Sequence, residues 1–377
     1  MKAKRLLFII NNRSFFISHR LPLAIAARNK GFEVHIATPQ GGVDLDIDEP
    51  GFIYHAYALS RKGTNPIAEL GSMYAVYKLI QKLRPDILHL VTIKPIIYGG
   101  LMARLLKVPA VVAAVSGLGT LFTAQSYGAR ILQRGIVQLY GYALRHPNVK
   151  VIFQNEDDRQ LLLKSKAFSK GQTTLIRGSG VDLHSYKDLP EKTGVVVVAM
   201  ISRLLSNKGV LEYVAAAKSL KASGVEARFL LIGEPDFDNP AYIDEAQLEQ
   251  WRKEGDVELL GFRKDIDAIL QDTHLVVLAS YREGLPKILA EAAACGRAVI
   301  TTDVPGCRDA IIPNKTGLLI PVKDAKALAE AMKRLIENPL ERLEFGKAGR
   351  ALAEREFGIE HIIAAHLKVY GELGFVS

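Results

Sequence analysis

The stretch Tyr281-Arg282-Glu283-Gly284-Leu285-Pro286-Lys287-Ile288-Leu289-Ala290-Glu291 decides the fold of this chain. The apolar run before it, 274–280, is typical of a buried strand, and the Ala-rich run after it, 288–295, is typical of a helix. A strand, a glycine-bearing loop and a helix form a nucleotide-binding corner of an open α/β sheet, because ligands bind at the carboxyl ends of the strands. Glu283 and Glu291 are then placed to hold the hydroxyls of a sugar and of a ribose.

The length and composition fit a two-domain globular protein. The chain has 377 residues, of which 49% are hydrophobic, enough for about two domains with sizeable cores. Its two cysteines, Cys295 and Cys307, form neither a disulfide framework nor a metal-ligand spacing, and they fit a reducing cytoplasm. The apolar run 6–10 is too short for a signal peptide, and no run of about eighteen apolar residues predicts a transmembrane helix.

The net charge of +9 is unevenly distributed along the chain. Residues 1–190 carry 25 Lys and Arg against 12 Asp and Glu, a formal charge of +13. Residues 191–377 carry 24 against 28, a charge of −4. A basic half indicates an anionic partner: nucleic acid, an acidic membrane face or a phosphorylated acceptor. Ordinary surface lysines are the alternative.

Short apolar runs alternate with helical segments through the first half. Continuous apolar strands between helices predict a parallel, doubly wound sheet. We expect strands over 5–10, 33–38, 53–59, 87–91, 109–115 and 149–153, and helices over 18–30, 65–83 and 98–106.

Polar residues and glycines follow several of these strands, where binding sites form. They are Ser14, His19, His89, Ser116 and Gly117. A glycine at such a place lets the backbone approach a ligand closely. Histidines at such places are more often structural than catalytic, and the glycine is equally compatible with a simple loop, so these residues are candidates only.

The segment 121–146 mixes large apolar residues with Arg130, Arg134 and Arg145 and contains no acidic residue. An apolar face rimmed by arginine is what an interfacial helix needs near anionic lipid. The alternative is a core helix with solvated arginines.

The second half predicts another sheet of the same kind after a polar linker at 187–193. We expect strands over 195–201, 228–232, 257–260, 274–280, 298–302 and 317–320, and helices over 210–223, 242–254, 265–272, 324–336, 340–356 and 359–373. Arg203 and Lys208 follow the first of these strands, close to the start of a helix. Two cations beside free helical amides are suited to a diphosphate.

Four motifs together resemble the family 4 retaining glycosyltransferases of the GT-B fold. They are Glu283-Gly284-Leu285-Pro286 with Glu291, Ser202-Arg203 with Lys208-Gly209, Gly180-Val181-Asp182, and Gly317-Leu318-Leu319. The resemblance covers essentially the whole chain. Five further segments are similar to a bacterial subgroup that builds undecaprenyl-diphosphate-linked glycans, capsule and O-antigen. They are 16–24, 86–89, 94–95, 116–119 and 236–240.

The resemblance implies a role for each motif residue. Arg203 and Lys208 would hold the donor diphosphate and stabilise the leaving group, and with Glu283, which binds the donor sugar, they form the implied catalytic set. Glu291 would bind the ribose. The remaining donor-binding residues would be the backbone of Gly284, Leu285 and Pro286, which faces sugar and phosphate, and Gly261 and Phe262, which hold the base.

No cofactor and no metal are implied, because the two cations take the role of a divalent ion. The acidic residues Asp44, Asp46 and Asp48 are expected to be solvated. The chain departs from many family members at Ser116, where they carry a histidine, so no acceptor-side base carries over.

We therefore expect an α/β protein of GT-B type, with two Rossmann-like doubly wound domains facing a central cleft. Residues 1–188 would form an acceptor-binding, membrane-facing domain, 189–357 the donor-nucleotide domain, and 358–377 a helix packing back on the first domain. The expected enzyme is a metal-independent retaining hexosyltransferase that transfers an N-acetylhexosamine from a UDP-sugar to a polyprenyl-diphosphate-linked glycan. It would be cytoplasmic and peripheral on the inner face of the cell membrane.

Two other classes of function are compatible with parts of the pattern. One is a sugar-nucleotide epimerase of the GT-B fold, which would need carboxylates between the domains that the sequence does not show. The other is a non-catalytic nucleotide- or nucleic-acid-binding protein. We expect no nucleic-acid partner, because no nucleic-acid motif appears and aromatic residues are not interleaved with the basic ones.

Overall fold

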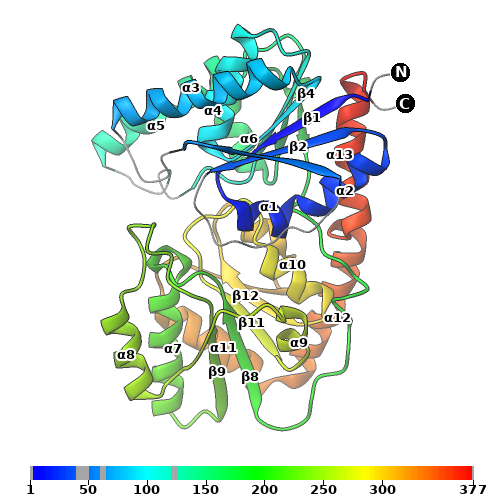
Figure 1. The fold of residues 1–377 in the computed structure, drawn as a ribbon. Helices are drawn as coiled ribbons and strands as arrows, with labels where there is room; N and C mark the ends of the chain where they lie inside the picture. The colour runs from blue at the N-terminus through cyan, green and yellow to red at the C-terminus, as the bar shows by residue number, and fades with distance from the viewer. Residues whose placement is uncertain (1–2, 40–50, 60–64, 120–121, 123–125, 376–377) are drawn as a thin grey trace. The chain divides into compact units, whose positions relative to one another are not determined.

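Two sheets, each covered by helices, account for the alternation of apolar strands and helices. The computed structural model describes residues 3–39, 51–59, 65–119, 122 and 126–375 (Figure 1). The chain divides into two compact units: residues 1–179 together with 360–377, and residues 180–359. Each unit is described by itself.

The first unit is built on a seven-stranded sheet in the order β3-β2-β1-β4-β5-β6-β7, with neighbouring strands paired in parallel. The strands are β1 (Arg5–Ile9), β2 (Glu33–Pro39), β3 (Phe52–Tyr57), β4 (Ile87–Val91), β5 (Ala110–Val115), β6 (Val149–Phe153) and β7 (Thr173–Leu175).

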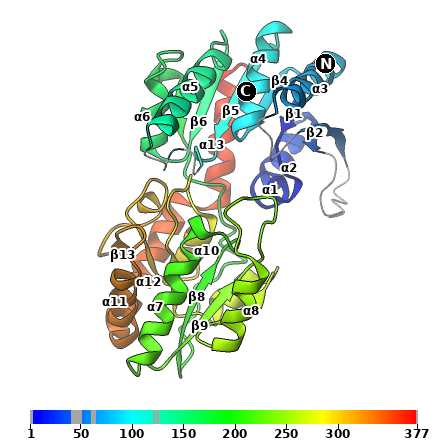
Figure 2. The ribbon, with the colours of Figure 1, turned by 90° about the vertical axis from the view of Figure 1, so that its left-hand side faces the viewer.

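Helices cover both faces of this sheet because alternate strand residues are apolar on both sides. The helices are α1 (Arg13–His19), α2 (Leu21–Asn29), α3 (Pro66–Leu83), α4 (Ile93–Leu105), α5 (Tyr127–Ala143), α6 (Glu156–Leu163) and α13 (Ile359–Glu372). Leu7 and Ile9 of β1 pack in a core with α3, α4, α5 and α6, whereas Leu6 and Phe8 pack with α1, α2 and α13. Helix α4 packs against both α3 and α5, and Figure 2 shows α5 next to α6.

The second unit contains a six-stranded parallel sheet in the order β10-β9-β8-β11-β12-β13. Its strands are β8 (Val196–Ile201), β9 (Ala227–Ile232), β10 (Glu258–Gly261), β11 (Leu275–Leu278), β12 (Ala298–Thr302) and β13 (Gly317–Ile320). Its helices are α7 (Val210–Ala222), α8 (Glu245–Glu254), α9 (Ile266–Gln271), α10 (Lys287–Ala294), α11 (Ala325–Glu337) and α12 (Pro339–Glu356). The prediction of two Rossmann-like doubly wound domains is confirmed.

The strand orders place one topological switch point in each unit. In the first unit the chain winds outward in both directions from the neighbours β1 and β4, and in the second from β8 and β11. Ligands of open α/β sheets bind at the carboxyl ends of the strands at such points. The two loops that follow β8 and β11 therefore mark the candidate site of the second unit.

Some boundaries differ from those expected from the sequence. Helix α1 starts at Arg13, five residues before the expected helix, because the side chain of Asn12 accepts a hydrogen bond from the amide of Phe15 at 2.9 Å and caps it. The chain divides at 179/180 rather than at 188/189. The polar segment 187–193 thus lies inside the second unit.

A buried ion pair explains why residues 187–193 pack on the second unit. The guanidinium of Arg342 on α12 bonds both carboxylate oxygens of Glu191, with Nη2 donating to Oε2 at 2.8 Å and Nε to Oε1 at 3.0 Å. The side chains are only 5% and 10% exposed. Arg342 Nη1 also donates to the carbonyl of Leu335 at 2.7 Å. The polar segment 187–193 therefore contains a residue of a buried ion pair and is not a linker.

No helix among the described residues combines the length and apolar composition needed to cross a lipid bilayer.

Breaking this buried pair should destabilise the protein. The variant Glu191→Ala leaves the Arg342 guanidinium buried without its counter-charge, so we expect the free energy of unfolding to fall by about 3 kcal/mol in denaturant titration. The matched control is Glu341→Ala, which breaks the more exposed pair of Arg334 and Glu341 and should cost less than about 1 kcal/mol. Equal losses in the two variants would contradict this account.

Candidate active site

The loops after β8 and β11 touch through their backbones. Gly209 has a left-handed conformation with φ of +80°, and a Cβ added there would collide with the carbonyl oxygen of Ala279. The amide of Tyr281 donates to the carbonyl of Asn207 at 3.0 Å. These contacts hold the start of α7 beside the loop that leads into α10.

Lys208 and Glu283 meet at this junction. Lys208 lies in a short 3-10 helix after β8, and its Nζ forms an ion pair with Oε1 of Glu283. The hydroxyl of Ser280, which is fully buried, donates to the same oxygen at 2.6 Å. Both charged side chains are mostly buried, with 19% and 15% exposed. The predicted neighbourhood of the two residues is present in the structure.

Arg203 lies in the same loop and is more accessible. Its Nη1 donates to Oδ2 of Asp236 at 2.7 Å. The Arg203 side chain is 55% exposed, whereas Asp236 is 19% exposed. The guanidinium is thus held by one acidic side chain while most of its surface faces solvent. An anion can reach it without a rearrangement of the core.

Glu291 is buried on α10, four residues beyond the first residue of that helix. Its Oε1 accepts a hydrogen bond from the phenol of Tyr186 at 2.8 Å and lies 3.1 Å from Nζ of Lys287. The residue is 6% exposed. Burial, with the nearby Glu291 carboxylate as a second cause, raises the pKa of Tyr186 well above its usual value, so the phenol keeps its proton.

The loop after β12 packs against the backbone that follows Glu283. The amide of Glu283 donates to the carbonyl of Pro305 at 3.1 Å. Gly306 has a φ of +83°, and a Cβ there would lie 2.5 Å from the carbonyl oxygens of both Glu283 and Gly284. Leu285 is buried in the core, and Pro286 is the N-cap of α10. The Gly284–Pro286 backbone is therefore well fixed.

Gly261 ends β10, and Phe262 follows it with 59% of its surface exposed. Gly261 accepts a hydrogen bond on its carbonyl from the amide of Gly233, the residue after β9, at 2.9 Å. These two positions lie at the carboxyl edge of the same sheet as the four charged residues. The structure brings all nine predicted catalytic and donor-binding residues to that edge of the second unit.

Most of the strand-end residues of the first unit also lie at one edge. Ser14 and His19 are on α1, where His19 stacks on Phe15 with ring centroids 4.1 Å apart. Ser116 and Gly117 follow β5, and Gly117 has a φ of +106°. Arg20, the residue after His19, reaches the hydroxyl of Ser116 with Nη2 at 3.4 Å. This bond links the end of α1 to the loop after β5.

His89 does not join that group. It is fully buried in β4, and its Nδ1 lies 2.7 Å from the hydroxyl of Tyr370 on α13. Burial, aided by the neighbouring His366 and Arg20, holds the pKa of His89 well below its usual value. The neutral imidazole is part of the core between the sheet and α13, so we no longer count it among the acceptor-side candidates.

Arg130, Arg134 and Arg145 are exposed, the first two on α5 and the third just beyond it. Large apolar side chains are exposed on the same helix: Tyr127, Ile131, Leu132, Leu139 and Tyr142. The arginines are therefore solvated, but the helix is not wholly a core helix. Asp44, Asp46 and Asp48 lie outside the described residues.

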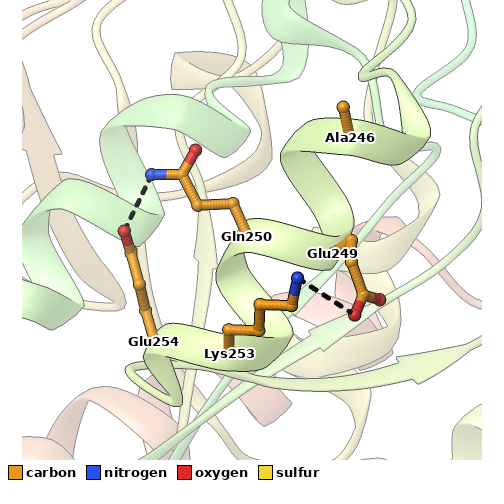
Figure 3. Close-up of a pocket in the computed structure, with 5 residues that line it drawn as sticks. All are labelled: Ala246, Glu249, Gln250, Lys253 and Glu254. Atoms are coloured by element: carbon orange, nitrogen blue, oxygen red, sulfur yellow. Dashed lines mark hydrogen bonds and ion pairs between the residues drawn. The ribbon is translucent and has the colours of Figure 1, made fainter.

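Neither of two other features offers a better site. A shallow hollow on α8 is lined by Ala246, Glu249, Gln250, Lys253 and Glu254 (Figure 3). Its polar side chains already bond one another, as in the 2.8 Å hydrogen bond from Gln250 to Glu254. The part of the chain that the structure describes contains no group of three or more His, Cys, Asp or Glu residues suited to a metal ion.

Sequence reasoning missed four residues that contact the predicted ones: Tyr186, Ser280, Asp236 and Lys287. Ser280 and Lys287 are close in sequence to the two glutamates, so strand and helix periodicity could have found them. Tyr186 follows the Gly180-Val181-Asp182 motif, but its partner Glu291 is 105 residues away. Only the fold brings that pair together.

Known proteins resemble this chain over nearly all of its length. Residues 5–155 match the glycosyl transferase 4-like family model, and residues 185–352 match that of the glycosyl transferases group 1. The chain is 30% identical to the N,N'-diacetylbacillosaminyl-diphospho-undecaprenol alpha-1,3-N-acetylgalactosaminyltransferase of Campylobacter jejuni, over 94% of this chain and 97% of that protein. It is 26% identical to the UDP-Gal:alpha-D-GlcNAc-diphosphoundecaprenol alpha-1,3-galactosyltransferase of Escherichia coli, over 82% of this chain and 81% of that one.

Solved structures of other glycosyltransferases share the fold. The crystal structure of HepE from Anabaena in complex with UDP and glucose superposes with a TM-score of 0.76 at 18% identity, covering 98% of this chain and 100% of that one. A glycosyltransferase from Rickettsia africae superposes with a TM-score of 0.74 at 17% identity, covering 99% of both chains. These likenesses confirm the GT-B fold, and the comparisons give no support to an epimerase. The chain therefore belongs to the group 1, glycosyl transferase 4-like family, and it is a hexosyltransferase.

Proposed function

We propose that this glycosyltransferase moves an N-acetylhexosamine from a UDP-sugar to a polyprenyl-diphosphate-linked glycan, with retention of configuration and without a divalent metal. The observation that carries the donor half is the cluster of Arg203, Lys208, Glu283 and Glu291 at the switch point of the second unit. In the reaction, the oxygen of an acceptor hydroxyl forms a bond to the anomeric carbon and gives up its proton. The bond from that carbon to the diphosphate oxygen breaks, and UDP leaves with the bonding electron pair.

The cations suit the departure of UDP. Negative charge develops on the leaving diphosphate, and fixed positive groups at that place stabilise the transition state more than the ground state. Arg203 offers a planar fork to phosphate oxygens, and Lys208 a compact charge near the sugar-binding glutamate. Helix α7 begins at Val210, two residues after Lys208, so its first amides add positive potential. These groups together supply the charge that a metal supplies elsewhere.

The carboxylates suit hydroxyl recognition. Glu283, held by Ser280 and Lys208, would accept hydrogen bonds from the donor sugar, with the fixed Gly284–Pro286 backbone facing sugar and phosphate. Glu291 would accept from the ribose. Phe262, with its exposed ring next to Gly261, would stack on the base. In these assignments each predicted donor-binding residue contacts one part of the donor: the sugar, a phosphate, the ribose or the base.

The acceptor half of the proposal rests on the names of the relatives and on charge. Both relatives described above are named for diphospho-undecaprenol acceptors. The basic half of this chain, +13 over residues 1–190, would attract such a diphosphate and an anionic membrane face. Ser14, His19, Ser116 and Gly117, at one edge of the first sheet, are the acceptor-side candidates.

The surface of the first unit fits peripheral binding to a membrane. Helices α3 and α5 lie on the same face of the sheet, on either side of α4 (Figure 1). Besides the exposed apolar residues of α5, helix α3 exposes Ile67 (79%), Leu70 (64%) and Tyr74 (60%). Apolar side chains with arginines among them are suited to the headgroup region of an anionic bilayer. Such binding would place the enzyme on the cytoplasmic face of the cell membrane.

The donor class can be tested with a thermal-shift panel of UDP-, GDP- and ADP-sugars in the presence of EDTA. We expect UDP-sugars to raise the melting temperature and the others to have little effect, because a ligand that binds only the native state stabilises it. Transfer activity should be unchanged by EDTA. A shift with GDP- or ADP-sugars instead would contradict the UDP assignment, and inactivation by EDTA would contradict metal independence.

The two glutamates should separate kinetically. Glu283→Gln should lower kcat by about 100-fold with little change in the KM for the donor, because its contact with the reacting sugar strengthens in the transition state. Glu291→Gln should raise the KM for the donor about 10-fold with little change in kcat, because a bond to a charged group is lost equally in both states. Steady-state kinetics with varied donor concentration measure both. The reverse pattern would exchange the two roles.

The membrane surface can be tested with Arg130, Arg134 and Arg145 all changed to Glu. We expect loss of cosedimentation with vesicles containing anionic lipid and a fall of about 10-fold or more in activity on a lipid-linked acceptor, since each cation contributes about 1 kcal/mol at an anionic surface. Activity on a short-chain, water-soluble diphosphate-linked acceptor should be retained.

The matched control changes Lys253, Lys326 and Lys333, exposed residues of the second unit, to Glu. This variant has the same net charge and should keep both vesicle binding and activity. Full activity of the arginine variant on the lipid-linked acceptor would overturn the membrane proposal.

A further inference from the structure

One oxygen of the Glu291 carboxylate is fully occupied by protein groups and the other is not. Oε1 accepts from the Tyr186 hydroxyl at 2.8 Å and lies 3.1 Å from Lys287 Nζ. Oε2 accepts no hydrogen bond from any group in the described part of the chain. A carboxylate has lone pairs on both oxygens, so this one still has capacity for a ligand.

Tyr186 is anchored independently of its phenol. Its amide donates to the carbonyl of Asp182 at 2.9 Å. Its carbonyl accepts from Nη1 of Arg350 at 2.9 Å, and the same nitrogen donates to the carbonyl of Ala294 at 2.7 Å. Ala294 is the last residue of α10. One guanidinium therefore fastens the backbone of Tyr186 to the helix that carries Glu291.

This anchoring gives the phenol a fixed position relative to Glu291. A glutamate side chain has several rotamers, and holding it in one of them costs up to about 2 kcal/mol of conformational entropy. A hydrogen bond from a group that is itself fixed selects one rotamer before the ligand arrives. Because the phenol stays protonated, as described above, it donates to Oε1 at any pH near neutrality.

We propose that Tyr186 is a positioning residue for the donor ribose: it holds Oε1 of Glu291 so that Oε2 is directed to the ribose hydroxyls. The inference rests on the proposed function, because it takes Glu291 as the ribose-binding residue. Tyr186 itself touches neither the sugar nor the phosphates in this scheme. Its effect therefore depends on ribose hydroxyls and on the carboxylate of Glu291, whereas a purely structural role would depend on neither.

The test compares UDP with 2′,3′-dideoxyuridine diphosphate in calorimetric titrations of the full-length protein. The wild type should bind UDP more tightly, because only UDP offers ribose hydroxyls to Glu291. Tyr186→Phe keeps the ring and removes the hydroxyl. We expect it to weaken UDP binding about 5-fold, the size of one lost hydrogen bond, and to leave binding of the dideoxy nucleotide unchanged. In steady-state kinetics the KM for the donor should rise while kcat is retained.

A matched control removes another buried phenol of the same unit. The hydroxyl of Tyr213 donates to the carbonyls of Val198 at 2.9 Å and Leu230 at 3.1 Å, within the core. Tyr213→Phe should lower the melting temperature and leave the affinity for UDP unchanged. Tyr186→Phe in a Glu291→Gln background should add nothing further to the loss of UDP affinity, because the group through which it acts is already altered.

The outcomes distinguish a wrong ribose assignment of Glu291 from a wrong positioning role of Tyr186. A wild type that binds both nucleotides equally would overturn the assignment of Glu291 to the ribose. A wild type that discriminates, with a Tyr186→Phe variant that loses affinity equally for both nucleotides or for neither, would overturn the positioning role alone. Additive losses in the double variant would overturn it as well.

Discussion

The carbonyl oxygen of Ala279 lies where a side chain at position 209 would stand, so only glycine fits there. This close approach brings the loop after β8 against the loop after β11, the two neighbours from which the second sheet winds outward. Lys208 and Glu283 become partners because the loops that carry them are already in contact. The cations come from one loop, and the carboxylates come from the other loop and the helix that follows it. The proposed donor site therefore depends on the packing of these two loops.

Much of this arrangement follows from local sequence patterns. Strands buried on both faces appear as continuous apolar runs, which made both sheets predictable. The rule that ligands bind at the carboxyl ends of parallel strands then gathered Arg203, Lys208 and the two glutamates correctly, although they are spread over about 90 residues. The sequence motifs placed Lys208 and Glu283 in one catalytic set, and the structure adds the direct ion pair between them.

Other features depend on partners far apart in the chain. The sequence around Glu191 predicts a polar linker. In the structure Glu191 forms a buried ion pair with Arg342, 151 residues away. The sequence predicts that His89 lies at a strand end and could face a ligand. In the structure α13, from the other end of the chain, covers it. Tyr186 carries no signal for its contact with Glu291. Periodicity reports which face of an element is buried, and it says nothing of which distant polar group completes a hydrogen bond.

The ion pairs of Arg203 with Asp236 and of Lys208 with Glu283 have a consequence for turnover. Each cation already has a carboxylate counterion, so the two ion pairs together are electrically neutral. An incoming diphosphate would exchange places with a resident counterion at Arg203 and would not meet a bare charge. Such an exchange lowers the affinity for the nucleotide. In the proposed reaction, Asp236 would re-form its ion pair with Arg203 as UDP departs, which would favour product release over product inhibition.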